Sequence, residues 1–84
     1  MVTVKLFGLF RLDTGIKELT ADADSVRALY PQLLAEAKRL RPDTTITQRD
    51  IDGCIVSVNG KAGNKNTKLH DGDEVLLMSP VCGG

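Results

Sequence analysis

The sequence contains no tryptophan, and its aromatic residues are one tyrosine and two phenylalanines among 84 residues. A domain of this length buries little more than about 60% of the surface that its unfolded chain exposes, so we expect one small, aliphatic core. The charges also balance, with 11 lysines and arginines against 11 aspartates and glutamates. Because proteins that bind nucleic acid through its phosphates usually carry a basic excess, we expect no nucleic-acid partner.

Cysteines and long apolar runs are scarce as well. The two cysteines, Cys54 and Cys82, are too few for a structural zinc site or an iron–sulfur cluster, which usually needs four ligands, so we expect no metal. No apolar run approaches the roughly 20 residues of a membrane helix, and residues 1–5 do not resemble a signal peptide. We therefore expect a cytoplasmic protein with no membrane partner.

Alternating apolar and polar residues, interrupted by turn residues, predict strands at residues 2–6, 16–20, 55–58 and 74–78. The first two strands are expected to form a hairpin with a long connection. Residues 61–68 are expected to form a loop or a short edge strand after the tight turn at Asn59-Gly60. A second turn is predicted at residues 71–73, with Asp71 capping its own backbone and Gly72 at positive φ, which favours a turn over a metal site. We expect the neighbouring His70 to be a solvated loop residue rather than a general base.

One helix is predicted between these strand pairs. It starts at residues 22–25, where short oxygen-bearing side chains can cap it, and it ends at Arg41-Pro42. Pro31 lies on the face opposite the apolar stripe and predicts a kink or a restart near Tyr30. Residues 43–53 are predicted to be an irregular crossover with one short helical turn. The apolar stripe consists of Val26, Leu29, Leu33, Leu34, Ala37 and Leu40.

This order of elements predicts an α+β fold in which one helix covers one face of a sheet. The arrangement that satisfies it is the β-grasp (ubiquitin-like) fold, with a mixed four- to five-stranded sheet and one main crossing helix. We expect residues 1–80 to form this domain and residues 81–84 to form a flexible Gly-Gly tail.

The tail, which runs from Pro80 through Val81 and Cys82 to Gly83 and Gly84, is expected to carry the chemistry. Glycine has no Cβ, so a Gly-Gly segment is thin enough to enter a channel that excludes side chains. A terminal carboxylate on Gly84 is a poor electrophile, but its acyl-adenylate reacts with a sulfur nucleophile. The product, a thiocarboxylate, holds a reactive sulfur on a tether.

Two segments of the sequence resemble the MoaD/ThiS family of sulfur carriers. Residues 67–75 (TKLHDGDEV) and 79–84 (SPVCGG) are similar to that family's closing signature of Asp-Gly-Asp, a valine-bearing strand and a Pro-Pro-Val-x-Gly-Gly tail. Residues 4–11 (VKLFGLFR) resemble the first strand and loop of the MoaD branch, which we favour, and residues 58–60 match its central strand and turn. Ser79 departs from the pattern by replacing a proline, and Cys82 occupies a variable position.

The resemblance implies a carrier rather than an enzyme. A MoeB/ThiF-like activating enzyme would use ATP to adenylate Gly84, which would then become a thiocarboxylate, and the carrier itself would bind no cofactor. In the MoaD branch the carrier docks into a MoaE-like large subunit and donates sulfur for molybdopterin, the ligand of the molybdenum or tungsten cofactor. Other destinations remain open, namely thiazole (thiamine) synthesis, tRNA thiolation and attachment to proteins as a ubiquitin-like modifier. A passive β-grasp interaction module is a further alternative.

The last strand predicts a docking surface. Val75 and Leu77 alternate with Leu76 and Met78, yet a sheet covered by one helix buries only one face. The exposed pair is either covered by the loop at residues 7–11 or left free as a docking patch. Because of the adjoining tail we favour docking, with Phe7, Leu76 and Met78 as candidates.

Cys54 is expected to pack as a small hydrophobic residue.

Overall fold

The computed structural model describes residues 1–78 of the chain, apart from the side chains of residues 9, 10 and 13. The predicted tail residues Pro80, Val81, Cys82, Gly83 and Gly84 lie outside the described residues. The elements in chain order are β1 (Val2–Phe7), α1 (Gly8–Thr14), β2 (Glu18–Ala21), α2 (Val26–Leu40), α3 (Gln48–Asp52), β3 (Ile55–Val58), β4 (Lys61–Gly63) and β5 (Glu74–Met78).

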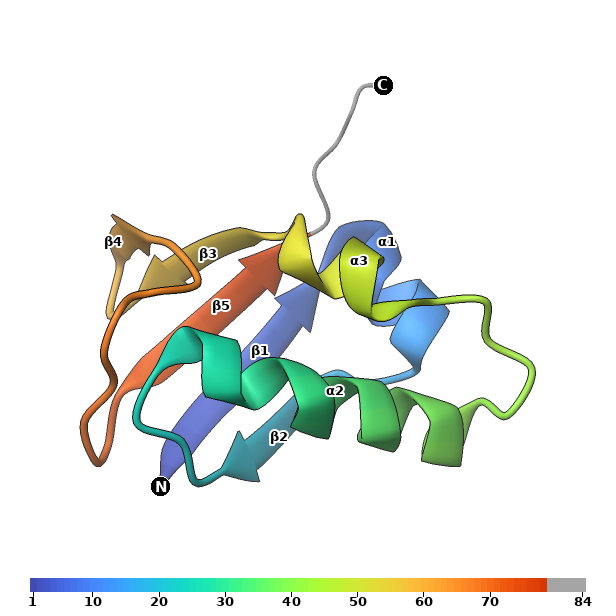
Figure 1. The fold of residues 1–84 in the computed structure, drawn as a ribbon, viewed down its shortest axis with the longest axis horizontal. Helices are drawn as coiled ribbons and strands as arrows, with labels where there is room; N and C mark the ends of the chain where they lie inside the picture. Colours follow the sequence, from blue (N-terminus) through green and yellow to red (C-terminus); the bar gives the residue numbers. More distant parts are fainter. Residues whose placement is uncertain (79–84) are drawn as a thin grey trace.

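The strands form one five-stranded mixed sheet in the order β2-β1-β5-β3-β4. The central strands β1 and β5 are parallel, and the other neighbouring strands are antiparallel. The main helix α2 crosses one face of this sheet (Figure 1). The predicted architecture, a mixed sheet with one main crossing helix, is confirmed. The bounds of β3 and β5 agree with the predicted strands, whereas β2 lies one to two residues later than predicted.

The face of the sheet under α2 is the hydrophobic core. Alternation along each strand directs every second side chain to this inner face. The fully buried side chains include Val4 and Leu6 of β1 and Val75 and Leu77 of β5. Helix α2 contributes Val26, Leu29, Leu33 and Ala37 of the predicted stripe, together with Tyr30, which the stripe did not include. Leu34 is partly buried and Leu40 is exposed, so the stripe ends one turn before the helix does.

Helix α2 is a single helix, so the predicted restart near Tyr30 is wrong. Its start was predicted correctly, because Ser25 is the N-cap and its side chain accepts a hydrogen bond from the backbone N–H of Ala28. Pro31 lies one and a half turns into the helix and is exposed, so its ring points away from the core, and the helix lacks the hydrogen bond that its nitrogen cannot donate. The interior proline therefore weakens the helix without breaking it.

The connection between β1 and β2 also differs from the prediction, because residues 8–14 form helix α1 rather than a loop. No side chain caps the start of α1 at Phe7, so the usual N-terminal signal is absent from the sequence. Its end is defined by Gly15, which has φ of +74° and donates its backbone N–H to the carbonyl of Arg11. Thr14 is buried at this end, and its hydroxyl accepts from the N–H of Ile16 at 3.0 Å.

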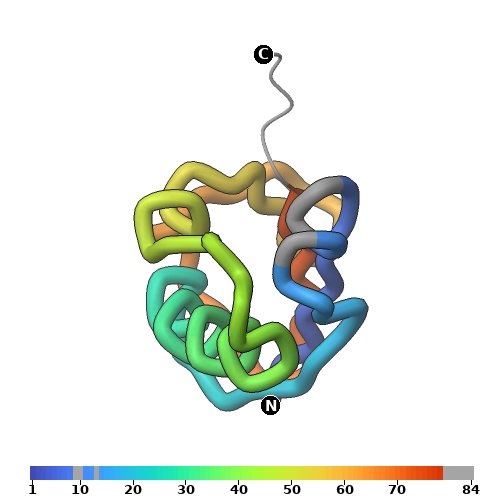
Figure 2. Tube along the Cα trace, turned by 90° about the vertical axis from the view of Figure 1, so that its right-hand side faces the viewer, coloured from blue at the N-terminus to red at the C-terminus, as the bar shows by residue number. Residues whose placement is uncertain are grey.

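Helix α3 lies next to α2, and α1 lies across from α3 (Figure 2). The short turn predicted within residues 43–53 is α3, which begins with a capping box between Thr47 and Asp50. Both α1 and α3 lie near the end of the sheet where β1 and β5 finish (Figure 1). Within residues 1–78, no helix has the length and apolar character needed to span a bilayer.

Candidate functional site

The outer face of the sheet carries a row of exposed apolar side chains at the end where β5 finishes. Met78 pairs with Phe7 of β1 on one side and with Ile55 of β3 on the other. Directly paired residues in neighbouring strands project to the same face, so these three side chains form a continuous row. Phe7 is 40% exposed, Met78 is 38% exposed and Ile55 is 47% exposed. We call these three residues the apolar row.

The structure brings the three predicted docking residues together. Phe7 and Met78 belong to the apolar row, and Leu76, two residues before Met78 on the same face, is half-buried beside it. The alternative was burial of Leu76 and Met78 beneath residues 7–11. Residues 8–14 form α1 and Met78 stays exposed, so this burial does not hold for Met78, whereas Leu76 is half-buried. That these side chains dock a partner remains a prediction.

Ile55 is the residue that the sequence reasoning missed. The alternation in β3 does indicate that Ile55 and Ser57 face the side opposite to Val56. The pairing of Ile55 with Met78, however, depends on the register between β3 and β5, which are separated in the chain by β4 and two loops. Local pattern alone does not determine such a register.

The outer face changes from apolar to charged with distance from the apolar row. The next row contains Glu18, Lys5, Leu76 and Ser57, which pair across the four strands β2, β1, β5 and β3. Lys5 forms an ion pair with Glu74 at 3.1 Å. The hydrogen bond and charge of Glu74 raise the pKa of Lys5, so its ammonium stays charged at neutral pH. An apolar end and a charged end therefore share one face.

The apolar row is adjacent in the chain to the predicted reactive segment, because residue 79 directly follows Met78. A partner that covers the row would therefore have the attachment point of the last residues inside its footprint. Gly84, Gly83, Cys82, Val81 and Pro80, which are the predicted tail residues, lie outside the described part of the chain.

The turn at residues 71–73 is structural, although Asp73 rather than Asp71 makes the cap. The Asp73 carboxylate accepts hydrogen bonds from the backbone N–H of His70 at 2.8 Å and from Nδ2 of Asn59 at 2.9 Å. The His70 bond, and then the Asn59 bond, lower the pKa of Asp73. Gly72 has φ of +88°, as predicted for the turn. His70 is exposed, also as predicted.

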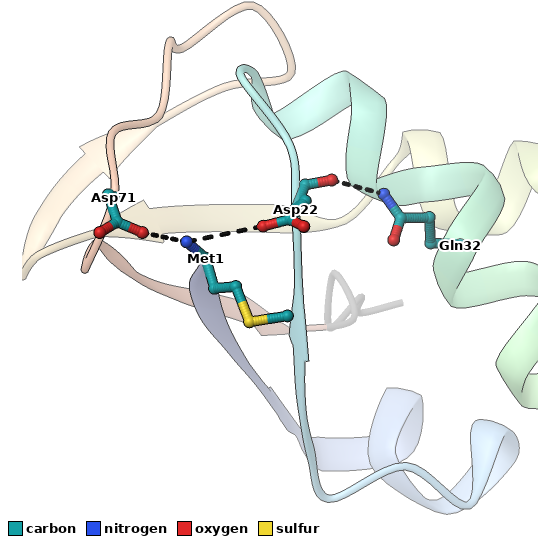
Figure 3. A network of polar contacts seen from close by, with 4 residues as sticks. All are labelled: Met1, Asp22, Gln32 and Asp71. Atoms are coloured by element: carbon teal, nitrogen blue, oxygen red, sulfur yellow. Dashed lines mark hydrogen bonds and ion pairs between the residues drawn. The ribbon is translucent and has the colours of Figure 1, made fainter.

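Asp71 has a different role from the one predicted. Its carboxylate accepts a hydrogen bond from the amino group of Met1, which also lies 3.6 Å from the carboxylate of Asp22 (Figure 3). Gln32 of α2 extends this network by donating to the backbone carbonyl of Asp22 at 2.9 Å. The network joins the start of β1 to the turn before β5 and to the segment before α2. It lies where β1 starts, whereas the apolar row lies where β1 ends.

Among the residues that the structure describes, no three histidine, cysteine, aspartate or glutamate side chains are grouped so that they could hold a metal ion. Cys54 packs against the core, which confirms its expected role as a small hydrophobic residue. Its Sγ lies 3.8 Å from the hydroxyl of Tyr30, and burial raises the pKa of its thiol. A buried thiol that stays protonated is a poor nucleophile, so the described part of the chain offers no activated cysteine.

Comparisons with known structures agree with this architecture. A chain in the complex of subunits 1 and 2 of the molybdopterin-converting factor of Helicobacter pylori is 28% identical with a TM-score of 0.57, and the match covers 99% of this chain and 97% of that one. The small archaeal modifier protein 1 of Methanosarcina acetivorans is 26% identical with a TM-score of 0.71, covering 99% and 95%. CysO of Mycobacterium tuberculosis is 26% identical with a TM-score of 0.63, covering 96% and 100%.

These neighbours confirm the ubiquitin-like β-grasp fold. A comparison with curated protein sequences gave no match. The model of the ThiS family, in contrast, matches residues 4–84, which is almost the whole chain and includes the Gly-Gly end. The chain therefore belongs to the ThiS family of ubiquitin-like sulfur carrier proteins.

Proposed function

We propose that this protein carries sulfur as a thiocarboxylate on Gly84 and donates it in molybdopterin synthesis. The Gly84 carboxylate attacks the α-phosphorus of ATP on a MoeB/ThiF-like activating enzyme, and pyrophosphate leaves. Hydrosulfide from the sulfur source then displaces AMP from the acyl-adenylate, so the C–O bond to AMP breaks as a C–S bond forms, and loss of the sulfur-bound proton leaves the thiocarboxylate. The carrier contributes the reacting carboxyl group, and the activating enzyme contributes the catalysis and the ATP site.

The observation that carries this proposal is the position of the apolar row at the end of β5. Exposed contiguous apolar side chains mark interaction sites. Here they occupy the strand whose last residue, Met78, leads into the residues that match the family's Gly-Gly end. A partner bound to the row would hold the start of that segment and thereby limit where Gly84 can reach.

Molybdopterin synthesis is the destination that we favour because of one neighbour. The Helicobacter pylori protein was solved as a complex of subunits 1 and 2 of molybdopterin-converting factor. By analogy, a MoaE-like large subunit would cover the apolar row of this chain and take the sulfur from Gly84. Water would then return an oxygen to the carbonyl carbon, which restores the carboxylate for another cycle.

Intact-mass spectrometry tests the first half of this cycle. The chain ending at Gly84 is incubated with the MoeB/ThiF-like enzyme of the same organism, ATP and a sulfur source. We expect the mass to increase by the replacement of one oxygen by sulfur, and fragmentation should place the change on Gly84. Because oxidation adds nearly the same mass, alkylation of the thiocarboxylate serves as a control.

A variant lacking Gly83 and Gly84 provides the matched negative control, because residues 1–78 and their docking face are unchanged. Adding the MoaE-like subunit with its pterin substrate should remove the sulfur from the wild-type chain. Absence of any ATP-dependent change at Gly84 would exclude the carrier function. A thiocarboxylate that forms but is not consumed by the MoaE-like subunit would exclude the molybdopterin destination alone.

Protein modification is a second candidate, favoured by the similarity to the small archaeal modifier protein 1. In that case the activated carboxyl group of Gly84 would react with a lysine amine of another protein and form an isopeptide bond. Tagged chain expressed in its own organism would then appear in higher-mass conjugates that depend on Gly84. Free tagged chain alone, under conditions that support thiocarboxylate formation, would exclude this second candidate.

A further inference from the structure

A basic cavity opens directly beside the apolar row. Its volume is about 250 Å³, and it lies between the end of β1 and the residues that lead into β2. Phe7 belongs both to the apolar row and to the wall of this cavity, so the two features form one continuous surface. The cavity is lined by Lys5, Leu6, Phe7, Arg11, Lys17 and Glu18.

The cations of this cavity outnumber its carboxylates. Lys5 is paired with Glu74 at 3.1 Å, and Glu18 is its direct neighbour across β1 and β2. Arg11 and Lys17, by contrast, form no ion pair with any side chain that the structure describes, a set that leaves out residues 9, 10 and 13. They come from separate segments, Arg11 from α1 and Lys17 from the turn before β2. The wall of the cavity therefore carries three cations and one carboxylate, and neither Arg11 nor Lys17 is engaged in a described ion pair.

Covering the apolar row would change the environment of these two cations. A partner that excludes water from Phe7 also removes water from the adjoining wall, and a charge that loses water without gaining a partner is strongly disfavoured. A carboxylate on the partner offsets that cost through charge-assisted hydrogen bonds, which an arginine forms especially well. The surface is therefore complementary to an apolar patch with an acidic side chain at its edge.

We infer that the activating enzyme of the proposed function places an aspartate or glutamate side chain in this cavity, against Arg11 and Lys17, when it covers the apolar row. The inference rests on the proposed function, since it names the chemistry of the partner at that same face. A contact made by the apolar row alone would be insensitive to salt. The acidic side chain of the partner would add an electrostatic component to that contact. Charges at the edge of an interface act mainly on the association rate.

A second basic cavity provides an internal control. It has a volume of about 240 Å³ and is lined by Asp24, Ser25, Arg27, Lys65, Asn66 and Lys68. The segment between β4 and β5 lies against the start of α2 here, on the side of the molecule away from α1 (Figure 1). Lys65 is exposed, as Lys17 is, and it has the same charge, but it lines this second cavity, which shares no residue with the apolar row or with the first cavity.

The test compares Lys17→Glu with Lys65→Glu, since both change the net charge by the same amount. Association with the MoeB/ThiF-like enzyme in the presence of ATP is measured by stopped-flow at low and at physiological salt. We expect Lys17→Glu to lower the association rate constant by about tenfold and to flatten its dependence on salt. Lys65→Glu is expected to stay within about twofold of wild type, because its charge lies outside the interface.

Arg11→Gln is the second variant, and it should also weaken association without reversing a charge. Thermal unfolding of all three variants establishes that they fold. If the wild-type chain is activated at Gly84 and both Lys17→Glu and Arg11→Gln associate at the wild-type rate, the acidic contact is wrong while the carrier function stands. Equal slowing by Lys65→Glu would also overturn the inference, because net charge alone would explain the effect. Failure to activate the wild-type chain would remove both proposals.

Discussion

Asn59 lies in the turn between β3 and β4, and Asp73 lies in the turn before β5. Nδ2 of Asn59 donates a hydrogen bond to Oδ1 of Asp73 at 2.9 Å. The same amide accepts, through its own Oδ1, the backbone N–H of Glu74 at 2.9 Å. Asn59 also has φ of +52°, a left-handed conformation that asparagine tolerates better than most residues. The Asn59 side chain therefore links the turn between β3 and β4 to the start of β5, the strand that ends at the apolar row.

Replacing Asn59 should destabilise the fold in two separable ways. Asn59→Gly keeps the positive φ accessible and loses only the side-chain bonds, which should lower the free energy of unfolding by about 1 kcal/mol. Asn59→Ala loses the bonds and also strains the turn, so its loss should be larger by roughly another 1 kcal/mol. Urea unfolding measures both values. Equal losses for the two variants would show that the left-handed turn carries no cost at this position.

The stability of the fold should depend on the ionisation of Asp73. Its pKa is lowered in the folded state, first by the His70 N–H and then by Asn59, relative to about 3.9 in an unfolded chain. The unfolded state thus takes up a proton more readily, and the stabilisation is fully present above about pH 4. It is lost as the pH falls through the lowered pKa of the folded state.

Asp73→Asn removes this ionisation and tests the assignment. The variant should be less stable than wild type near neutral pH, and the difference should shrink as the pH falls below about 4. Unfolding curves between pH 3 and pH 7 measure it. Asp43→Asn, at an exposed position in the segment between α2 and α3, is the matched control. A constant difference between wild type and Asp73→Asn over this range would contradict the assignment.

The sequence predicts the strands well where the alternation is regular and turn chemistry is strong. Strand β5 starts after Asp71-Gly72-Asp73, and β3 ends at Val58, directly before Asn59-Gly60, whose two residues both take positive φ. In these segments the residue types specify the backbone directly, because few residues accept a left-handed conformation. The candidate patch followed from the same alternation, since only one face of the sheet can be covered by one helix.

The errors arise where tertiary contacts decide the structure. Helix α1 has no side-chain cap at its start, and Gly15, which ends it, is also consistent with the predicted loop. The role of Asp71 depends on the amino group of Met1, 70 positions earlier in the chain. Ile55 joins the apolar row only through the register of β3 against β5. Patterns within a few residues of each site carry no information about these long-range pairings.

Pro31 offers a test of how much an interior proline costs this domain. In α2 its nitrogen cannot donate to the carbonyl of Arg27, four residues earlier, so the helix lacks one hydrogen bond. Pro31→Ala should restore that bond and raise the free energy of unfolding by about 1 to 2 kcal/mol, after allowing for the greater freedom of the unfolded chain. Chemical denaturation with an unchanged m-value would measure it. A variant that is less stable than wild type would show that the exposed ring stabilises the helix.

The apolar row can be tested by adding charge where it meets a partner. Met78→Asp and Ile55→Asp should each leave the fold intact, because both side chains are more than a third exposed in the free protein. Each should weaken binding to the MoeB/ThiF-like enzyme by about tenfold or more, since a carboxylate buried against an apolar surface loses its water without gaining a partner. Titration calorimetry or fluorescence anisotropy would measure the affinity.

Leu40→Asp is the matched control for these two variants. Leu40 is 42% exposed, close to the values of Met78 and Ile55, but it lies at the end of α2 on the opposite layer of the fold. Its replacement changes charge and hydrophobicity equally and should leave affinity unchanged. A loss of affinity in Ile55→Asp that is absent in Leu40→Asp would establish that the row extends to β3, as the register with Met78 requires. Loss in Met78→Asp alone would confine the contact to β1 and β5 and leave Ile55 outside it.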